Sequence, residues 1–68
     1  MENTLLLNSE QLLKATDIAY ILNISRAMAY RLMQLGKIST VSIGTAKRVR
    51  PKDLRIFIEN NLSPMSEV

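Results

Sequence analysis

The sequence predicts a mainly α-helical domain with one small β-hairpin, arranged as a winged helix-turn-helix. Three observations indicate this fold class. Residues 18–38, IAYILNISRAMAYRLMQLGKI, show helical apolar spacing interrupted by one short turn. The next dozen residues alternate between polar and apolar, which is typical of a hairpin. A proline then opens a last segment with helical spacing, so the predicted order is helix, turn, helix, hairpin, helix.

The first helix is predicted from Ala15 to Leu22. Asp17 falls in its first turn, where a carboxylate stabilises the positive end of the helix dipole. Asn23 tolerates the left-handed conformation that ends many helices. The apolar residues at helical spacing form the expected buried stripe of this helix: Ile18, Ala19, Ile21 and Leu22.

The second helix is predicted from Arg26 to about Leu35. Ser25 is a good N-cap, and Gly36 stands at the position where a left-handed glycine commonly ends a helix. Ile24 in the turn is expected to fill the core. The inward side is predicted to carry Ala29, Leu32 and Met33, and the outward side Ala27, Tyr30, Arg31 and Gln34.

The hairpin is predicted around the turn Gly44-Thr45. Its expected inner face is Val41, Ile43 and Val49. Arg48 and Arg50 are expected to share the other face, because successive side chains of a strand alternate.

Pro51 suits the start of the last helix, and Asp53 falls in that first turn. This helix is expected to end near Leu62, with Leu54, Phe57, Ile58 and Asn61 along one face.

The predicted domain occupies residues 12–62, between an N-terminal segment at 1–11 and a flexible tail at 63–68. The N-terminal segment is expected to be partly ordered or to form a contact, because three adjacent leucines, Leu5-Leu6-Leu7, need cover. They fit either an extended segment or a helix capped by Ser9.

Composition narrows the function classes. The chain has 68 residues and neither Cys nor His, so it has no disulfide, no usual zinc ligand set and no usual catalytic nucleophile or base. The carboxylates are scattered, and no enzyme activity, metal or cofactor is expected. Nothing resembles a secretory signal or a membrane span, and a cytoplasmic location is expected.

Charge distribution indicates a polyanionic partner. The net charge is +3, from nine basic and six acidic residues. Seven of the basic residues lie between Arg26 and Lys52, with no Asp or Glu among them. A helix of this size fits the major groove of DNA, and a one-sided basic surface attracts its phosphates. The sequence therefore predicts double-stranded DNA as the partner.

Residues 12–61 resemble the excisionase-type DNA-binding domain, a small winged relative of the mercury-resistance-regulator (MerR) class. The resemblance rests on Leu13, Asp17-Ile18-Ala19, Leu22-Asn23-Ile24-Ser25-Arg26, Ala29-Tyr30, Leu32, Gly36-Lys37-Ile38, Val41, Ile43-Gly44, Arg48-Val49-Arg50 and Asp53-Leu54. It implies a non-catalytic excisionase, a recombination directionality factor or a small transcriptional regulator. It also implies that the second helix enters the major groove and that the wing contacts the minor groove or the backbone.

The resemblance also implies which residues contact DNA. On the second helix these are Arg26, Ala27, Tyr30, Arg31 and Gln34, and on the wing they are Lys47, Arg48 and Arg50. Beside the resemblance, Ser25 at the start of the second helix is a further expected contact, and Lys37 and Lys52 are expected to contact at most the DNA backbone. Arg26 and Arg31 have the geometry to read guanine edges, and a tyrosine hydroxyl suits a phosphate.

Three further expectations concern partners. One recognition helix touches few base pairs, which favours cooperative binding of several copies to repeated sites. An integrase is a further possible partner. The alternative function is a protein-interaction module that keeps the fold without significant DNA binding, since the second helix shows apolar Ala27 and Met28 where small hydroxyl residues are frequent in the family.

Overall fold

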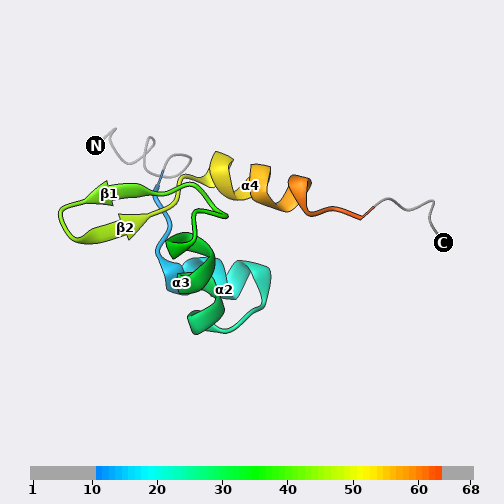
Figure 1. The fold of residues 1–68 in the computed structure, drawn as a ribbon, viewed down its shortest axis with the longest axis horizontal. Coiled ribbons are helices and arrows are strands. Elements are labelled where there is room, and N and C mark those ends of the chain that lie inside the picture. Colours follow the sequence, from blue (N-terminus) through cyan, green and yellow to red (C-terminus); the bar gives the residue numbers. More distant parts are fainter. Residues whose placement is uncertain (1–10, 64–68) are drawn as a thin grey trace, which may run out of the picture.

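The computed structural model describes residues 11–63, and in this range the predicted winged helix-turn-helix is confirmed (Figure 1). The elements are α2 (Ala15–Leu22), α3 (Arg26–Gln34), β1 (Val41–Ile43), β2 (Ala46–Arg48) and α4 (Pro51–Asn60). The expectations for Leu5-Leu6-Leu7 and Ser9 lie outside the described residues. Figure 1 shows the hairpin and α4 extending in opposite directions from the α2–α3 pair.

Both helices of the helix-turn-helix end in the same hydrogen-bonded motif. At the end of α2, Asn23 has a φ of 59°, and the Ile24 amide donates to the Ala19 carbonyl at 2.9 Å. At the end of α3, Gly36 has a φ of 76°, and the Lys37 amide donates to the Leu32 carbonyl at 2.9 Å. A left-handed residue followed by this bond satisfies carbonyls that would otherwise lack a partner.

The helix starts are also capped locally. The Ser25 hydroxyl accepts a hydrogen bond from the Met28 amide at 3.1 Å, which confirms Ser25 as the N-cap of α3. At the start of α2, the Asp17 carboxylate accepts from the Lys14 amide at 2.9 Å. The chain therefore turns between α2 and α3 within three residues, with both helix ends satisfied.

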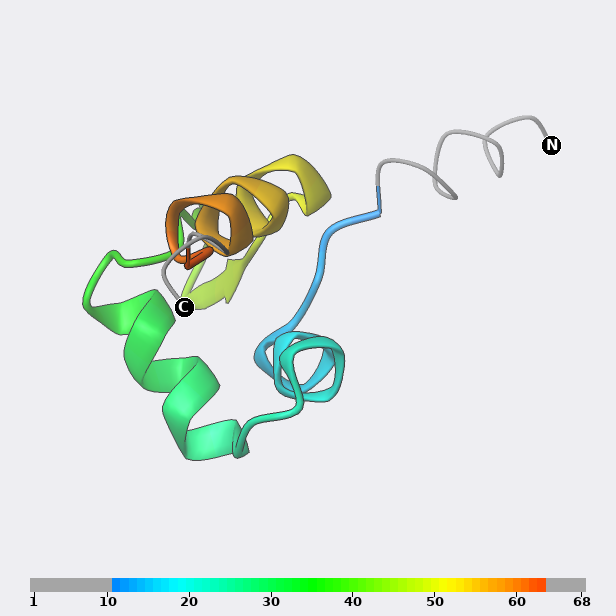
Figure 2. The same ribbon diagram turned by 90° about the vertical axis from the view of Figure 1, so that its right-hand side faces the viewer.

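The core lies where α2 and α3 meet the base of the hairpin and the first turn of α4. Its buried members are Ala15, Ile18, Ala19, Ala29, Met33, Ile38, Val49 and Leu54. Ala29 is fully buried in the same cluster as two alanines of α2, so small side chains let the two helices approach closely. Figure 2 shows α2 and α3 beside one another.

The hairpin is antiparallel and short, with Val41 paired to Arg48 and Ile43 paired to Ala46. Its base is fixed by an isolated bridge between Leu13 and Val49. The Leu13 amide donates to the Val49 carbonyl at 2.8 Å, and the Val49 amide donates back at 2.9 Å. The segment before α2 is thus joined to the chain directly after β2.

Some side-chain predictions were wrong. Ile21 is half exposed on α2, and Ile43 is half exposed on β1. Arg48 lies directly opposite Val41, so these two share a face of the hairpin instead of lying on opposite faces.

Ile58 is also exposed, because α4 contacts the core only through its first turns. The physical reason is common to Ile21, Ile43 and Ile58. A domain this small lacks a second layer to cover every apolar position.

We expect Ile18→Val to destabilise the domain by about 0.5–1.5 kcal/mol, because Ile18 is fully buried. Ile21→Val in the same helix is the matched control and should change stability little, since that side chain is half exposed. Thermal unfolding followed by circular dichroism measures both variants. For a domain of this size the expected fall in Tm is about 4–8 °C per kcal/mol. Equal shifts for both variants would contradict the burial difference.

Candidate nucleic-acid interface

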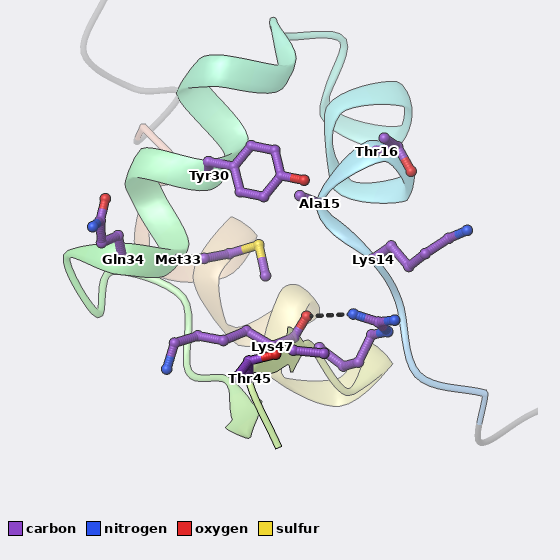
Figure 3. A pocket seen from close by; sticks show the side chains of 10 residues that line it. Lys14, Ala15, Thr16, Tyr30, Met33, Gln34, Thr45 and Lys47 are labelled. Carbon is purple, nitrogen blue, oxygen red and sulfur yellow. Dashed lines mark hydrogen bonds between the residues drawn. The ribbon is translucent and has the colours of Figure 1, made fainter. Parts of the chain in front are cut away.

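An open cleft of about 720 Å³ lies between α2, α3 and the hairpin. Its lining residues come from the start of α2, from α3, and from the turn and second strand of the hairpin: Lys14, Ala15, Thr16, Tyr30, Met33, Gln34, Thr45, Ala46, Lys47 and Arg48. Figure 3 shows the Tyr30 ring extending from α3 toward Ala15, with the Met33 side chain beside it. None of the described residues lining the cleft is acidic.

The predicted reading residues of α3 are all exposed. Tyr30 and Gln34 face the cleft, whereas Arg26, Ala27 and Arg31 are not among the residues that line it. The helix thus carries two exposed arginines outside the cleft, and a tyrosine and an amide that line it. Ser25 is exposed at the start of α3, where its hydroxyl accepts the hydrogen bond from the Met28 amide that caps the helix.

The predicted wing residues divide by position. Lys47 and Arg48 lie on β2, where both line the cleft. The Lys47 ammonium donates to the Ser42 hydroxyl across the hairpin at 3.3 Å, and Arg48 Nη1 donates to the Lys47 carbonyl at 3.0 Å. Lys37 follows α3 and Lys52 lies in the first turn of α4; both are exposed and outside the cleft.

Comparison with known proteins places this arrangement in a family. The family model described as "Helix-turn-helix domain" matches residues 12–62, about three-quarters of the chain. The chain belongs to this family. No curated protein and no solved structure matches the sequence of this chain. The helix α3 is therefore the second helix of a DNA-binding helix-turn-helix domain, and its outward side is exposed.

Arg50 is placed differently from the other wing residues of this helix-turn-helix domain. It lies beyond β2, directly before α4, and forms a two-pronged ion pair with Asp53. The Nε–Oδ2 distance is 2.6 Å and the Nη2–Oδ1 distance is 3.1 Å. Asp53 is buried, so its carboxylate is held inside the fold by this arginine.

The pair shifts both pKa values. The hydrogen bonds from Arg50 lower the pKa of Asp53, burial opposes this, and the positive charges of Arg50 and Lys52 add to the lowering. The same hydrogen bonds raise the pKa of Arg50. Arg50 thus carries its charge at every ordinary pH, but its guanidinium is committed to Asp53 at the base of the hairpin.

Lys14, Thr16 and Thr45 line the cleft of this helix-turn-helix domain but were not among the predicted site residues. No local pattern identifies them, because they meet Tyr30 and Lys47 only after α2 packs on α3 and the hairpin folds back. The one signal in the sequence is the basic character of Lys14, which stands directly before the first helix.

The described residues contain no group of three or more His, Cys, Asp or Glu side chains arranged to hold a metal ion. Within residues 11–63, none of the helices combines the length and apolar character needed to cross a bilayer.

The Arg50–Asp53 pair predicts acid sensitivity. A carboxyl whose pKa is lower in the folded state contributes stability above its unfolded pKa, and that stability is lost as the pH falls through the folded value. We therefore expect the free energy of unfolding to fall below about pH 4. Asp53→Asn should flatten this acid limb and lower stability at neutral pH. Urea unfolding across the pH range measures it.

Glu59→Gln is the matched control for this experiment, since it removes an exposed carboxylate from the same helix. The acid limb should persist in this variant, because Arg50 and Asp53 remain. An Asp53→Asn protein with an unchanged acid limb would contradict the assigned role of the pair.

Proposed function

We propose that this chain is a non-catalytic, sequence-preferring protein that binds double-stranded DNA, with α3 in the major groove and the basic hairpin on the minor groove or backbone. The observation that carries the proposal is the juxtaposition in one helix-turn-helix domain of an exposed polar α3 and a hairpin carrying Lys47 and Arg48. A helix fits the major groove, while arginine and lysine are attracted to phosphates and to narrow minor grooves.

Different residues supply specificity and affinity in this proposal. Arg26 and Arg31 read base edges, because each guanidinium can bond to guanine in two places. Tyr30 donates its hydroxyl to a phosphate and fixes the position of the helix. Ala27 offers apolar contact to a thymine methyl group. Gln34 lies at the C-terminal end of α3, and we assign it to the backbone or solvent.

The biological role we propose is that of an excisionase-like recombination directionality factor, related to the MerR-type domain, or a small transcriptional regulator. In either role several copies bind cooperatively to repeated or inverted sites, and in the first an integrase is a further partner. The short recognition helix supports cooperative binding, because α3 has nine residues and reaches only a few base pairs.

Selection of bound sequences from a random duplex pool at moderate salt tests the function directly. We expect a short enriched motif, present in repeated or inverted copies if binding is cooperative. On the selected duplex, about five phosphate contacts should give a slope of about −4 to −5 in log affinity against log salt concentration. Absence of binding to any duplex would overturn the proposal.

A salt-insensitive complex with another protein, alongside negligible DNA binding, would instead support the alternative of a protein-interaction module. The half-exposed Met28 on α3 is the feature that such a partner would contact.

Arg31→Gln should distinguish recognition of base edges from sequence-independent attraction to the phosphates. We expect it to weaken binding to the selected site by about 1–3 kcal/mol and to relax the preference at one base pair. Lys37→Gln is the control, since the loss of a lysine that contacts only the backbone should weaken binding to all sequences equally. Titrations with the selected duplex and with a duplex changed at each position measure the difference. An unchanged base preference in Arg31→Gln would remove Arg31 from the reading residues.

A further inference from the structure

The cleft between α3 and the hairpin has a consequence that rests on the proposed DNA-binding function. In a duplex, each major groove is separated from the next minor groove by one sugar–phosphate strand. A protein that inserts a helix into one groove and a hairpin into the neighbouring groove must let that strand pass between them. In this chain the space between the two elements is the cleft, and its third side is the start of α2.

The walls of the cleft match the chemistry of such a strand. Three cationic side chains line it, Lys14, Lys47 and Arg48, together with three hydroxyl groups, Thr16, Tyr30 and Thr45. Cations and hydroxyl donors are the side chains that contact phosphates. Ala46 adds a partly exposed apolar side chain to the wall, which suits the carbon face of a deoxyribose.

The cations lie at both ends of the cleft. Figure 3 shows Lys14 projecting on the α2 side and Lys47 projecting on the opposite side. Successive phosphates of one strand are about 3.4 Å apart along the duplex axis, so two separated lysines neutralise different phosphates. Asp17 is the acid closest in sequence, but it lines a separate depression with Tyr20 and Ile21, and its carboxylate is bonded to the Lys14 amide.

We propose that the cleft holds the DNA backbone strand between the two grooves, and that Lys14 and Thr16 of the first helix contact its phosphates. This adds a third contact region to the reading helix and the hairpin. Lys14 supplies a positive charge and Thr16 a hydroxyl donor to the same strand that Tyr30 and Lys47 contact from the other walls. Their role is to position the protein, because phosphates carry no base identity.

Charge variants of the full chain test the proposal on the selected duplex. Lys14→Gln should reduce the slope of log affinity against log salt by about 1, with no change in base preference. Arg55→Gln is the matched control, because it removes one positive charge from an exposed position on α4 outside the cleft. Thr16→Val should weaken binding without changing the slope, and Thr16→Ser should restore it. Circular dichroism checks that each variant is folded.

Neutral methylphosphonate groups, placed one at a time along the duplex, locate the contact. For wild type we expect loss of affinity at the phosphates between the reading-helix site and the hairpin site. At one of these, the loss should be at least about threefold smaller in Lys14→Gln than in wild type, since the two changes remove the same interaction. Arg55→Gln should keep the full wild-type loss at that position.

The outcomes separate the inference from the function on which it rests. Wild-type protein that binds no duplex overturns both. Wild-type protein that binds, with Lys14→Gln matching Arg55→Gln in slope and in methylphosphonate sensitivity, overturns the cleft assignment alone.

Discussion

The two hydrogen bonds between Leu13 and Val49 are the constraint on which the placement of the hairpin and the cleft depends. They join the residue just before Lys14 and α2 to the residue just after β2, which places the hairpin against the helix pair. Val49 is fully buried at this point, so the bridge also completes the core. A three-residue strand pair alone is marginal in water, and attachment at its base gives it a fixed direction. The cleft exists because of that attachment.

Arg50 and Asp53 extend the same constraint to α4. The chain leaves β2, passes the buried Val49 and immediately enters α4, and the ion pair spans that junction. A buried carboxylate is costly unless it is paired and hydrogen-bonded, so Asp53 requires the arginine. One basic residue of the acid-free stretch is therefore structural. Lys47 and Arg48 donate hydrogen bonds to neutral groups of the hairpin, so their charges are not neutralised by these bonds.

Local chemistry explains what could be predicted from the sequence. Asn23, Ser25 and Gly36 define the turn and the helix ends through bonds to residues within five positions, and the structure confirms them. Side chains whose environment depends on distant partners were harder to assign. The predicted turn at Gly44-Thr45 gives the observed register, in which Val41 pairs with Arg48. Arg48 was assigned to the wrong side because Val49 was grouped with the inner face of the hairpin, whereas Val49 pairs with Leu13 outside the β1–β2 ladder. Lys14 and Thr16 join the site only through tertiary packing, which no spacing along the chain encodes.

The size of α3 limits how specific a single copy can be. In the proposed function, two bidentate arginines, Arg26 and Arg31, would supply about 2–6 kcal/mol of base discrimination at most. Specific DNA-binding proteins typically prefer their sites by about 4–10 kcal/mol over other sequences, so one copy falls at the low end. Phosphate contacts in the proposed cleft would raise affinity for every sequence alike and would not close this gap. The remaining specificity must come from sequence-dependent groove shape sensed by the hairpin, or from several copies on repeated sites. The balance of a small reader and a larger backbone-binding surface therefore favours a protein that acts on arrays of sites.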